Sequence, residues 1–156
     1  MKKTCLFLLL GAMALILLSA SAAAAGRTVL ATGECGDSVT WEAWEDADGV
    51  RTLEVSGSGP ITERVSPDVY NPFIERVIIH EGITSINSST FTSWPLTSVR
   101  ELSLPASCIS IGEFAFYSSD LRSLTLAEGL QTIGEHAFFP KTGLLTPTVS
   151  SSSPLR

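Results

Sequence analysis

The side chains of this chain that could do chemistry are few, and none stands in a recognisable catalytic pattern. His80 follows an apolar-x-apolar triplet and His136 precedes an Ala-Phe pair, so neither belongs to a nucleophile or metal-ligand motif. Ser58 stands in Gly-Ser-Gly, which lacks the Gly-x-Ser-x-Gly spacing of a nucleophile elbow. We interpret both histidines as solvated or packed scaffold residues. The sequence therefore predicts no catalytic residue, and we expect a protein that is not an enzyme.

An acidic group near residue 45 could suggest a calcium site. It contains Glu42, Glu45, Asp46 and Asp48, and the Asp-Ala-Asp-Gly run that begins at Asp46 is similar to half of a calcium-binding loop. Trp44, however, occupies the place of the first ligand, and no bidentate glutamate follows at the required distance. Asp and Gly at these places also supply turn chemistry. We therefore predict a hairpin turn here, with no metal site and no cofactor.

Trp44 is the candidate for carbohydrate binding. Apolar and polar residues alternate over 39–45 and again over 51–55, which predicts a β-hairpin over 39–56. Trp44 then falls on the opposite strand face from Trp41, and an exposed indole could stack on a sugar ring. The alternative, which we favour, is that Trp44 packs against the loop at 63–70.

The strongest pattern in the chain is an apolar spacing that occurs three times. Its anchors are Ile79, Leu104 and Leu126, which are 25 and 22 residues apart. A fixed period in this range indicates a solenoid, whose units bury their apolar faces against one another. The other repeated positions are Ile74, Val77, Ile83, Ile86 and Phe91, then Val99, Leu102, Cys108, Ile111 and Phe116, then Leu121, Leu124, Leu130, Ile133 and Phe138.

Each unit also predicts its own short elements. The triplets at 77–79, 102–104 and 124–126 are expected to be strands with flanking members inward and middle members outward, stacked as a parallel sheet. Gly112 and Gly134 suit a tight bend before the next turn. The phenylalanine that ends each unit should stack in one aromatic column. The fold class is therefore a repeat solenoid of the leucine-rich-repeat type, preceded by the hairpin as an N-terminal cap.

The same patterns divide the chain into segments. We expect a signal peptide over 1–25, a hairpin and cap region over 26–73, three repeats over 74–139, and a disordered Ser/Thr/Pro tail over 140–156. The third repeat then has no evident polar cap, although a solenoid normally needs one. The open end predicts self-association through that repeat or a truncated gene product.

The N-terminal segment has the order of features that marks export. Two lysines come first, Leu6–Leu18 is an apolar core, and Ser19–Ala25 supplies the small residues of a cleavage site. We place cleavage after Ala25, with Ala22 and Ala23 as alternatives. A membrane anchor is the other interpretation, but the apolar run is shorter than the roughly 20 residues needed to span a bilayer. We expect a secreted or cell-surface protein with no membrane insertion after cleavage.

The charge of the chain excludes several classes of partner. Ten basic and 16 acidic residues give a net charge of −6. Residues 1–25 contain two lysines and no acidic residue, so the remainder has 8 basic and 16 acidic residues and a net charge of −8. No Lys/Arg cluster occurs in it, whereas phosphate binding needs clustered cations. Nucleic acid and anionic lipid are therefore excluded as expected partners.

Two cysteines remain after the leader, Cys35 and Cys108. Export permits a disulfide between them. Cys108, however, occupies the repeat position held by Ile83 and Leu130, which is typical of a buried small hydrophobic residue. We favour two free thiols, and the disulfide stays as the alternative.

Residues 98–139, SVRELSLPASCISIGEFAFYSSDLRSLTLAEGLQTIGEHAFF, resemble BspA-like leucine-rich repeats, the Treponema pallidum type. The family's Leu-x-Leu strand, Ile-Gly and Ala-Phe correspond to 102–104, 111–112 and 115–116, and recur at 124–126, 133–134 and 137–138. Residues 33–61 also resemble the region that often precedes such arrays. The resemblance implies a secreted or surface-exposed binding protein, because some members are described as adhesins for host extracellular proteins or other microbes.

The outward row of the strand sheet is the candidate binding site. Repeat proteins bind partners on such faces, and the expected partner is an extracellular or host protein. Plain solvated sheet is the alternative interpretation, and Ile78 is the one apolar outlier. The candidate residues are Arg76, Ile78, His80, Glu101, Ser103, Ser123 and Thr125.

Overall fold

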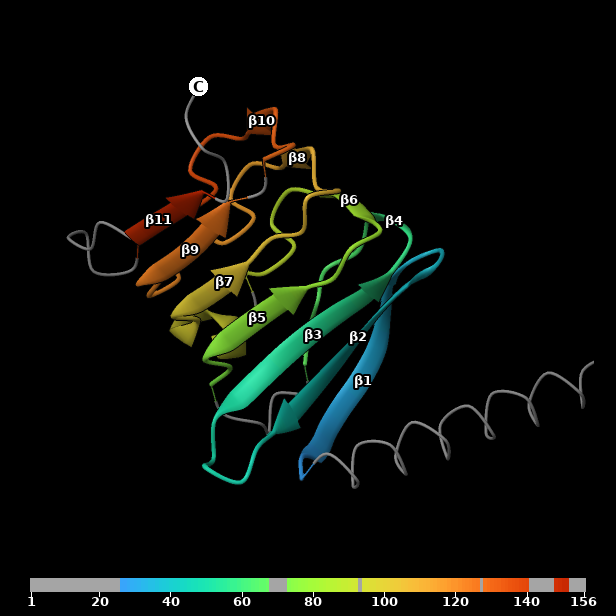
Figure 1. Cartoon of the computed structure of the whole chain (residues 1–156), viewed down its shortest axis with the longest axis vertical. Coiled ribbons are helices and arrows are strands. Elements are labelled where there is room, and N and C mark those ends of the chain that lie inside the picture. Colours follow the sequence, from blue (N-terminus) through green and yellow to red (C-terminus); the bar gives the residue numbers. More distant parts are fainter. Residues whose placement is uncertain (1–25, 68–72, 93, 127, 141–147, 152–156) are drawn as a thin grey trace, which may run out of the picture.

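A computed structural model describes residues 26–67, 73–92, 94–126, 128–140 and 148–151. The predicted signal peptide therefore lies outside the described residues. The strands form two sheets, a seven-stranded sheet in the order β1-β2-β3-β5-β7-β9-β11 and a four-stranded sheet in the order β10-β8-β6-β4. Figure 1 shows the four short strands of the second sheet beyond the arrowheads of the first. The predicted repeat solenoid of short parallel strands is confirmed.

Three antiparallel strands open the described chain. They are β1 (Thr28–Gly36), β2 (Val39–Glu45) and β3 (Arg51–Gly57). The hairpin predicted over 39–56 is confirmed as β2 and β3, whereas β1, within the predicted cap region over 26–73, was not predicted as a strand. At its turn the Asp46 carboxylate accepts hydrogen bonds from the backbone N–H groups of Asp48 and Val50, both at 2.9 Å. The acidic group thus contributes a hairpin turn, as predicted.

The hairpin continues directly into the repeats. β3 pairs in parallel with β5 (Arg76–Ile79), β5 with β7 (Glu101–Ser103), and β7 with β9 (Ser123–Leu126). The predicted triplets therefore lie side by side in one sheet. Because β3 occupies the edge that β5 would otherwise expose, the hairpin covers the first repeat.

The second sheet is built from strands that the sequence analysis did not separate from the turns. They are β4 (Gly59–Ile61), β6 (Ile83–Ile86), β8 (Ser110–Ile111) and β10 (Thr132–Ile133), and all pair in parallel. A 3₁₀ helix at Trp94–Ser98 lies in the longer connection between the first two repeats. Each coil thus contributes one strand to each sheet.

The C-terminal segment differs from the prediction of a disordered tail. β11 (Thr148–Ser151) pairs in parallel with β9 and adds a seventh strand to the first sheet. Its sequence, Thr-Val-Ser-Ser, has no apolar alternation, so the pairing rests on backbone hydrogen bonds that side-chain patterns do not reveal. The rest of 140–156 apart from Pro140 lies outside the described residues.

The core between the two sheets is the predicted apolar interior. Its largest fully buried side chains include Phe91 and Phe116, and the aromatic column is confirmed. The rings of Phe91 and Phe116 stack with centroids 4.7 Å apart, and those of Phe116 and Phe138 with centroids 5.6 Å apart. In both pairs the ring planes are nearly parallel, with an angle of 8° between them.

The third repeat is buried less completely than predicted. Ile133, expected inward, is 50% exposed, and Leu126, Leu130 and Phe138 are only partly buried. The physical reason is that β10 is the edge strand of its sheet, so no further described coil covers it. The expected open end therefore exists on the four-stranded sheet, whereas β11 covers β9 on the other sheet.

At two repeated glycines the backbone of the preceding coil lies too close to leave room for a side chain. A Cβ atom on Gly112 would lie 2.4 Å from the backbone nitrogen of Ser88, and one on Gly134 would lie 2.4 Å from that of Glu113. Neither glycine has a positive φ. The glycines are thus explained by close approach of the adjacent backbone, and the tight bend that we predicted is not their main reason.

Both cysteines are free and buried, as predicted. Burial raises the pKa of the Cys35 thiol to about 11, and the nearby Glu63 carboxylate adds to the rise. Burial also raises the pKa of the Cys108 thiol. Because the thiolate is the reactive form, both side chains behave as packed hydrophobic groups.

The aromatic column supports a first prediction. Phe116→Ala should lower the free energy of unfolding by about 3–5 kcal/mol, because a ring stacked on both sides leaves a cavity that rigid coils cannot close. Chemical denaturation measures this change. Ile109→Ala is the matched control, since Ile109 is 46% exposed, and its cost should stay within about 0.5 kcal/mol. Equal losses in the two variants would contradict the stacked core.

Candidate binding face

The register of the strands brings most of the predicted site residues together. Arg76, Glu101 and Ser123 are cross-strand neighbours, and they form one row across β5, β7 and β9. Ile78, Ser103 and Thr125 form a second row beside it. We call the side of the seven-stranded sheet that carries these two rows the outer face.

The core side of the same strands shows why the rows point outward. Val77, Leu102 and Leu124, which alternate with the row residues, are all buried. Because successive side chains of a strand point to opposite faces, their neighbours must face solvent. The structure therefore places six of the seven predicted residues on one surface.

His80 is the seventh predicted residue and lies just beyond the end of β5. Its backbone N–H donates to the Val55 carbonyl oxygen at 2.9 Å, which continues the β3–β5 pairing by one step. Its imidazole Nε2 lies 4.0 Å from Glu54 Oε1, and the side chain is half exposed. His80 thus borders the outer face beside a carboxylate.

The outer face extends further than the sequence prediction. Glu54 is the cross-strand neighbour of Ile78, Thr52 is that of Arg76, and Glu42 faces Glu54 across the hairpin. The prediction stopped at the repeats and missed these residues. The period-two alternation of the hairpin was the signal that could have placed them on the same face.

Arg27 neutralises the two glutamates of the hairpin. Its guanidinium lies 3.0 Å from Glu42 Oε1 and 3.1 Å from Glu54 Oε2. Glu42 is only 8% exposed, and a carboxylate so buried is tolerated when a cation is in contact with it. The acidic pair is therefore a structural part of the sheet, with its charge largely compensated.

Trp44, the carbohydrate candidate, lies under the same arginine. The Arg27 guanidinium carbon is 5.0 Å from the centre of the indole ring, a cation–π contact. Trp44 is partly buried, with Val29 and Thr52 as cross-strand neighbours. A sugar ring cannot stack on the indole face that Arg27 covers. The predicted packing partner, the loop at 63–70, lies partly outside the described residues.

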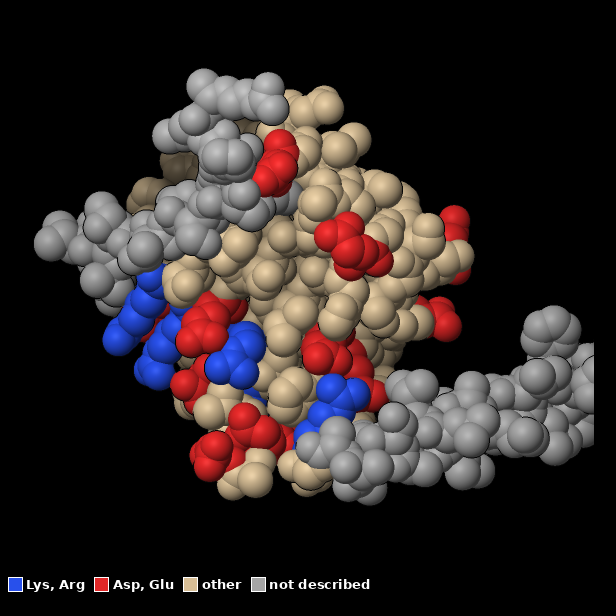
Figure 2. Space-filling view, in the orientation of Figure 1, with Lys and Arg blue, Asp and Glu red and all other residues tan. Residues whose placement is uncertain are grey.

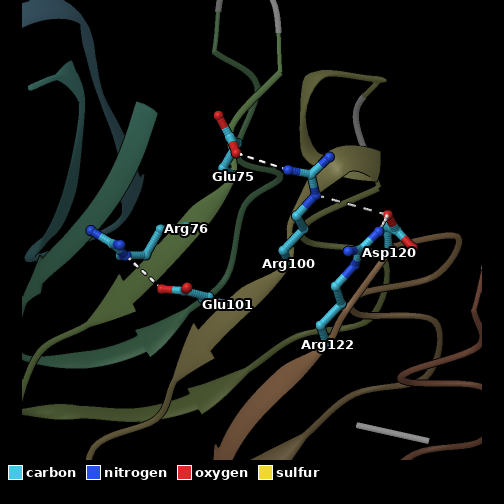
Figure 3. A network of polar contacts seen from close by, with 6 residues as sticks. All are labelled: Glu75, Arg76, Arg100, Glu101, Asp120 and Arg122. Atoms are coloured by element: carbon cyan, nitrogen blue, oxygen red, sulfur yellow. Dashed lines mark hydrogen bonds and ion pairs between the residues drawn. The ribbon is translucent and has the colours of Figure 1, made fainter. Parts of the chain in front are cut away.

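Charged side chains gather at one border of the outer face, where the repeat strands begin. In Figure 2 blue and red atoms cluster over that border, and the centre of the same view is mainly uncharged. Arg76 Nε lies 2.8 Å from Glu101 Oε2, and Arg100 Nη1 lies 3.1 Å from Glu75 Oε2. These two pairs come from adjacent coils, as Figure 3 shows.

A second set of contacts extends this border to the third repeat. Arg100 Nε lies 4.0 Å from Asp120 Oδ2, and Arg122 Nη2 lies 3.5 Å from the same oxygen (Figure 3). The arginines are largely exposed, so each pair contributes about 0–1 kcal/mol to stability. The border is thus a network of mutually paired charges along one side of the outer face.

The centre of the face is small, neutral and partly apolar. Ser103 lies beside Ile78 and Thr125 lies beside Ser103, and Ile78 is only partly buried on this solvent-facing row. An apolar centre with a charged and polar rim is the usual anatomy of a protein–protein interface. The arrangement therefore suits binding through surface contact.

No feature of the face supports catalysis or metal binding. Over the part of the chain that the structure describes, no group of three or more His, Cys, Asp or Glu residues could hold a metal ion. His136 lies away from this face, with its ring stacked on Phe114 at 5.2 Å and Nδ1 3.3 Å from Glu135 Oε1. Among the described residues, no helix is long and apolar enough to cross a membrane.

An open depression of about 440 Å³ lies on the four-stranded sheet. Its lining comprises Thr62, Ile86, Asn87, Ser88, Ser110, Ile111, Gly112 and Thr132. None of these side chains titrates near neutral pH, so the depression offers no acid–base pair. Its polar groups are hydroxyls and one amide.

Behind the outer face, one carboxylate ties the first repeat to the second. Glu81 accepts hydrogen bonds from the backbone N–H groups of Ala106 at 2.8 Å and Ser107 at 3.2 Å. The Ser107 hydroxyl accepts a bond from the Gly82 N–H and donates one to the Ile83 carbonyl oxygen. The bond from Ala106, followed by those from Ser107, lowers the pKa of Glu81 below its usual 4.5, although desolvation opposes the change.

This carboxylate gives a second prediction. A pKa depressed in the folded state stabilises the fold above the unfolded-state pKa, and the stabilisation is lost as the pH falls through the folded-state value. Glu81→Gln should therefore lower the melting temperature at pH 7 and flatten its dependence on pH below about 4.5. Thermal unfolding across pH measures both effects. Glu34→Gln, which removes an exposed carboxylate from β1, controls for net charge, and an identical response of both variants would refute the tie.

Comparison with known proteins supplies the family context of this face. The family model described as the BspA type leucine rich repeat region, with 6 copies, matches residues 69–153, which is more than half of the chain. No curated protein matches the sequence. The match covers every repeat strand of the outer face from β5 to β11.

Two solved structures are similar. A leucine-rich repeat protein from Eubacterium ventriosum is 19% identical, with a TM-score of 0.46, over 78% of this chain and 36% of that one. A leucine rich cell surface protein from Faecalibacterium prausnitzii is 15% identical, with a TM-score of 0.30, over 81% of this chain and 55% of that one. The matched part of this chain thus spans about a third of the first structure and just over half of the second.

Proposed function

The chain belongs to the BspA-type leucine-rich repeat family, and from this premise we propose that it is an exported, non-enzymatic binding or adhesion protein. Its partner is an extracellular protein, and the contact surface is the outer face of the seven-stranded sheet. Secretion or surface display follows from the predicted signal peptide over 1–25 and belongs to the same proposal.

One observation carries this proposal. Ile78 is an apolar side chain on an otherwise polar outward row, with Glu54 and Ser103 as its cross-strand neighbours. Desolvation of an isoleucine at the centre of a contact is favourable, whereas on a plain solvated sheet it has no role. The paired charges of Arg76 and Glu101 beside it suit the rim, because paired charges lose less on burial than single ones.

Glycan binding through Trp44 is the alternative function. It is supported only by the indole's place on the outer face, and it requires Arg27 to leave the ring. Self-association through the third repeat is compatible with either function, because Ile133 is half exposed on the edge strand β10. The variants Ile78→Glu and Trp44→Ala separate the protein-binding and glycan-binding proposals.

The third prediction tests the outer face. Ile78→Glu should weaken binding of the exported chain to fibroblast-deposited extracellular matrix about tenfold, because a carboxylate replaces the apolar centre. Its melting temperature should change by less than about 3 °C, since the side chain is on the solvent side. Solid-phase binding and thermal unfolding measure the two quantities.

Ile109→Glu is the matched control, because it places the same charge at an exposed isoleucine outside the outer face. It should bind matrix like the unchanged chain. Equal binding by the Ile78→Glu variant would contradict the proposal. Loss of binding in Trp44→Ala alone, together with competition by free glycan, would favour the carbohydrate alternative.

A further inference from the structure

The turns of the second and third repeats carry a cluster of rings that the outer-face proposal does not use. The two turns have the sequences Glu-Phe-Ala-Phe-Tyr over 113–117 and Glu-His-Ala-Phe-Phe over 135–139. In each turn the column phenylalanine, Phe116 or Phe138, is buried or partly buried, and further rings stand two residues before it and one residue after it. We define the aromatic edge as Phe114, Tyr117, His136 and Phe139.

The four rings of the aromatic edge contact one another. Phe114 and His136 stack with centroids 5.2 Å apart, and Tyr117 and Phe139 stack with centroids 5.4 Å apart. Phe114 also meets Tyr117 edge to face at 5.3 Å, and His136 lies 5.5 Å from Phe139. The edge is therefore one continuous surface two coils high.

A repeated backbone conformation turns these rings away from the core. Phe114 and His136 have φ values of 56° and 55°, in the left-handed region that residues other than glycine rarely adopt. The residues that follow them, Ala115 and Ala137, are buried. The positive φ thus directs Phe114 and His136 outward and the alanine that follows each of them inward, at the same point of both coils.

Three of the four rings are substantially exposed, and two of them belong to the third repeat, which no further described coil covers. Tyr117 is 39% exposed, Phe139 46%, and the His136 side chain 40%. At the matching positions the first repeat has Ser89 and Thr92, so the rings of the aromatic edge do not continue into that repeat. A contiguous aromatic patch on a surface marks an interaction site, whereas isolated exposed rings are ordinary.

The charged residues within the two turns are acidic, whereas Lys141 follows Pro140 outside the described residues and Arg64 precedes Val65, whose N–H donates to the Thr90 carbonyl oxygen in the first-repeat turn. Glu113 and Glu135 precede the rings in both turns, and both are exposed. In the described turn segments 87–92, 112–119 and 134–140, the sequence contains no Lys or Arg. The patch differs in this respect from the border of the outer face, where arginines neutralise the carboxylates.

We propose that the aromatic edge is a second docking site, which binds a Lys- or Arg-rich segment of an extracellular protein. Ring faces attract guanidinium and ammonium groups, and the adjacent carboxylates add charge complementarity. A planar guanidinium at the third-repeat end of the stack would lie against the ring faces of His136 and Phe139. The site is independent of the outer face.

The same observations argue against a second copy of the chain or a neutral sugar as the occupant of the aromatic edge. Two copies of the chain meeting through this edge would bring four carboxylates together, which is unfavourable in a protein of net charge −6. A neutral sugar would use the ring faces but gain no charge complementarity from Glu113 and Glu135. A basic peptide uses both features.

The fourth prediction uses fluorescein-labelled octa-arginine and the full exported chain. Fluorescence anisotropy should show saturable binding, weakened about 2- to 5-fold by Tyr117→Ala, because each exposed ring contributes one cation–π contact. Tyr117→Phe keeps the ring and should bind within about 2-fold of the unchanged chain. The double variant Glu113→Gln with Glu135→Gln should weaken binding and flatten its dependence on salt.

Glu101→Gln and Ile78→Glu are the controls, because they alter the outer face and leave the aromatic edge intact. Because these residues do not belong to the aromatic edge, both variants should bind octa-arginine with an affinity within about 2-fold of the unchanged chain. Equal losses in Glu101→Gln and in the Glu113/Glu135 variant would reduce the effect to general charge attraction and overturn the proposal. Binding of maltohexaose in place of octa-arginine, or a rise in mass with concentration that Tyr117→Ala abolishes, would overturn it in favour of a sugar or a second copy.

Discussion

The structure depends on one constraint, which is that successive coils stack backbone against backbone while each adds a phenylalanine to a common column. The close approach is visible at Gly112 and Gly134, where a Cβ atom would collide with the preceding coil. The column is visible in the stacked rings of Phe91, Phe116 and Phe138. Short strands of two to four residues have little stability alone, so their pairing needs this shared interior.

The same stacking creates the surfaces on which the functional proposals rest. Because every coil repeats one backbone path, outward residues from different coils are brought into rows, such as Arg76 with Glu101 and Ile78 with Ser103. The turns are brought into register in the same way, which places Tyr117 over Phe139. One periodicity thus produces both a sheet face with paired Arg and Glu charges and an aromatic edge flanked by Glu113 and Glu135.

The features that recur with the repeat period were predicted from the sequence, and the features that do not recur were missed. The strand triplets, the outward row and the aromatic column recur at fixed spacing, so one alignment of the units placed them. β1 was missed because Gly33 and Gly36 interrupt its alternation; Gly33 is there because Trp41 packs where its Cβ would be. β11 was missed because its pairing with β9 is made by backbone groups. Arg27 over Trp44 was missed because the contact joins separate strands and no local pattern encodes it.

Coupling between the rings of adjacent coils reports directly on the shared interior of the stack. A double-mutant cycle with Phe91→Leu and Phe116→Leu, followed by chemical denaturation, isolates the interaction between the two side chains. The stacked geometry predicts a coupling free energy of about 0.5–1.5 kcal/mol. Strict additivity of the two substitutions, within about 0.3 kcal/mol, would mean that the coils do not share a packed interior and would contradict the account.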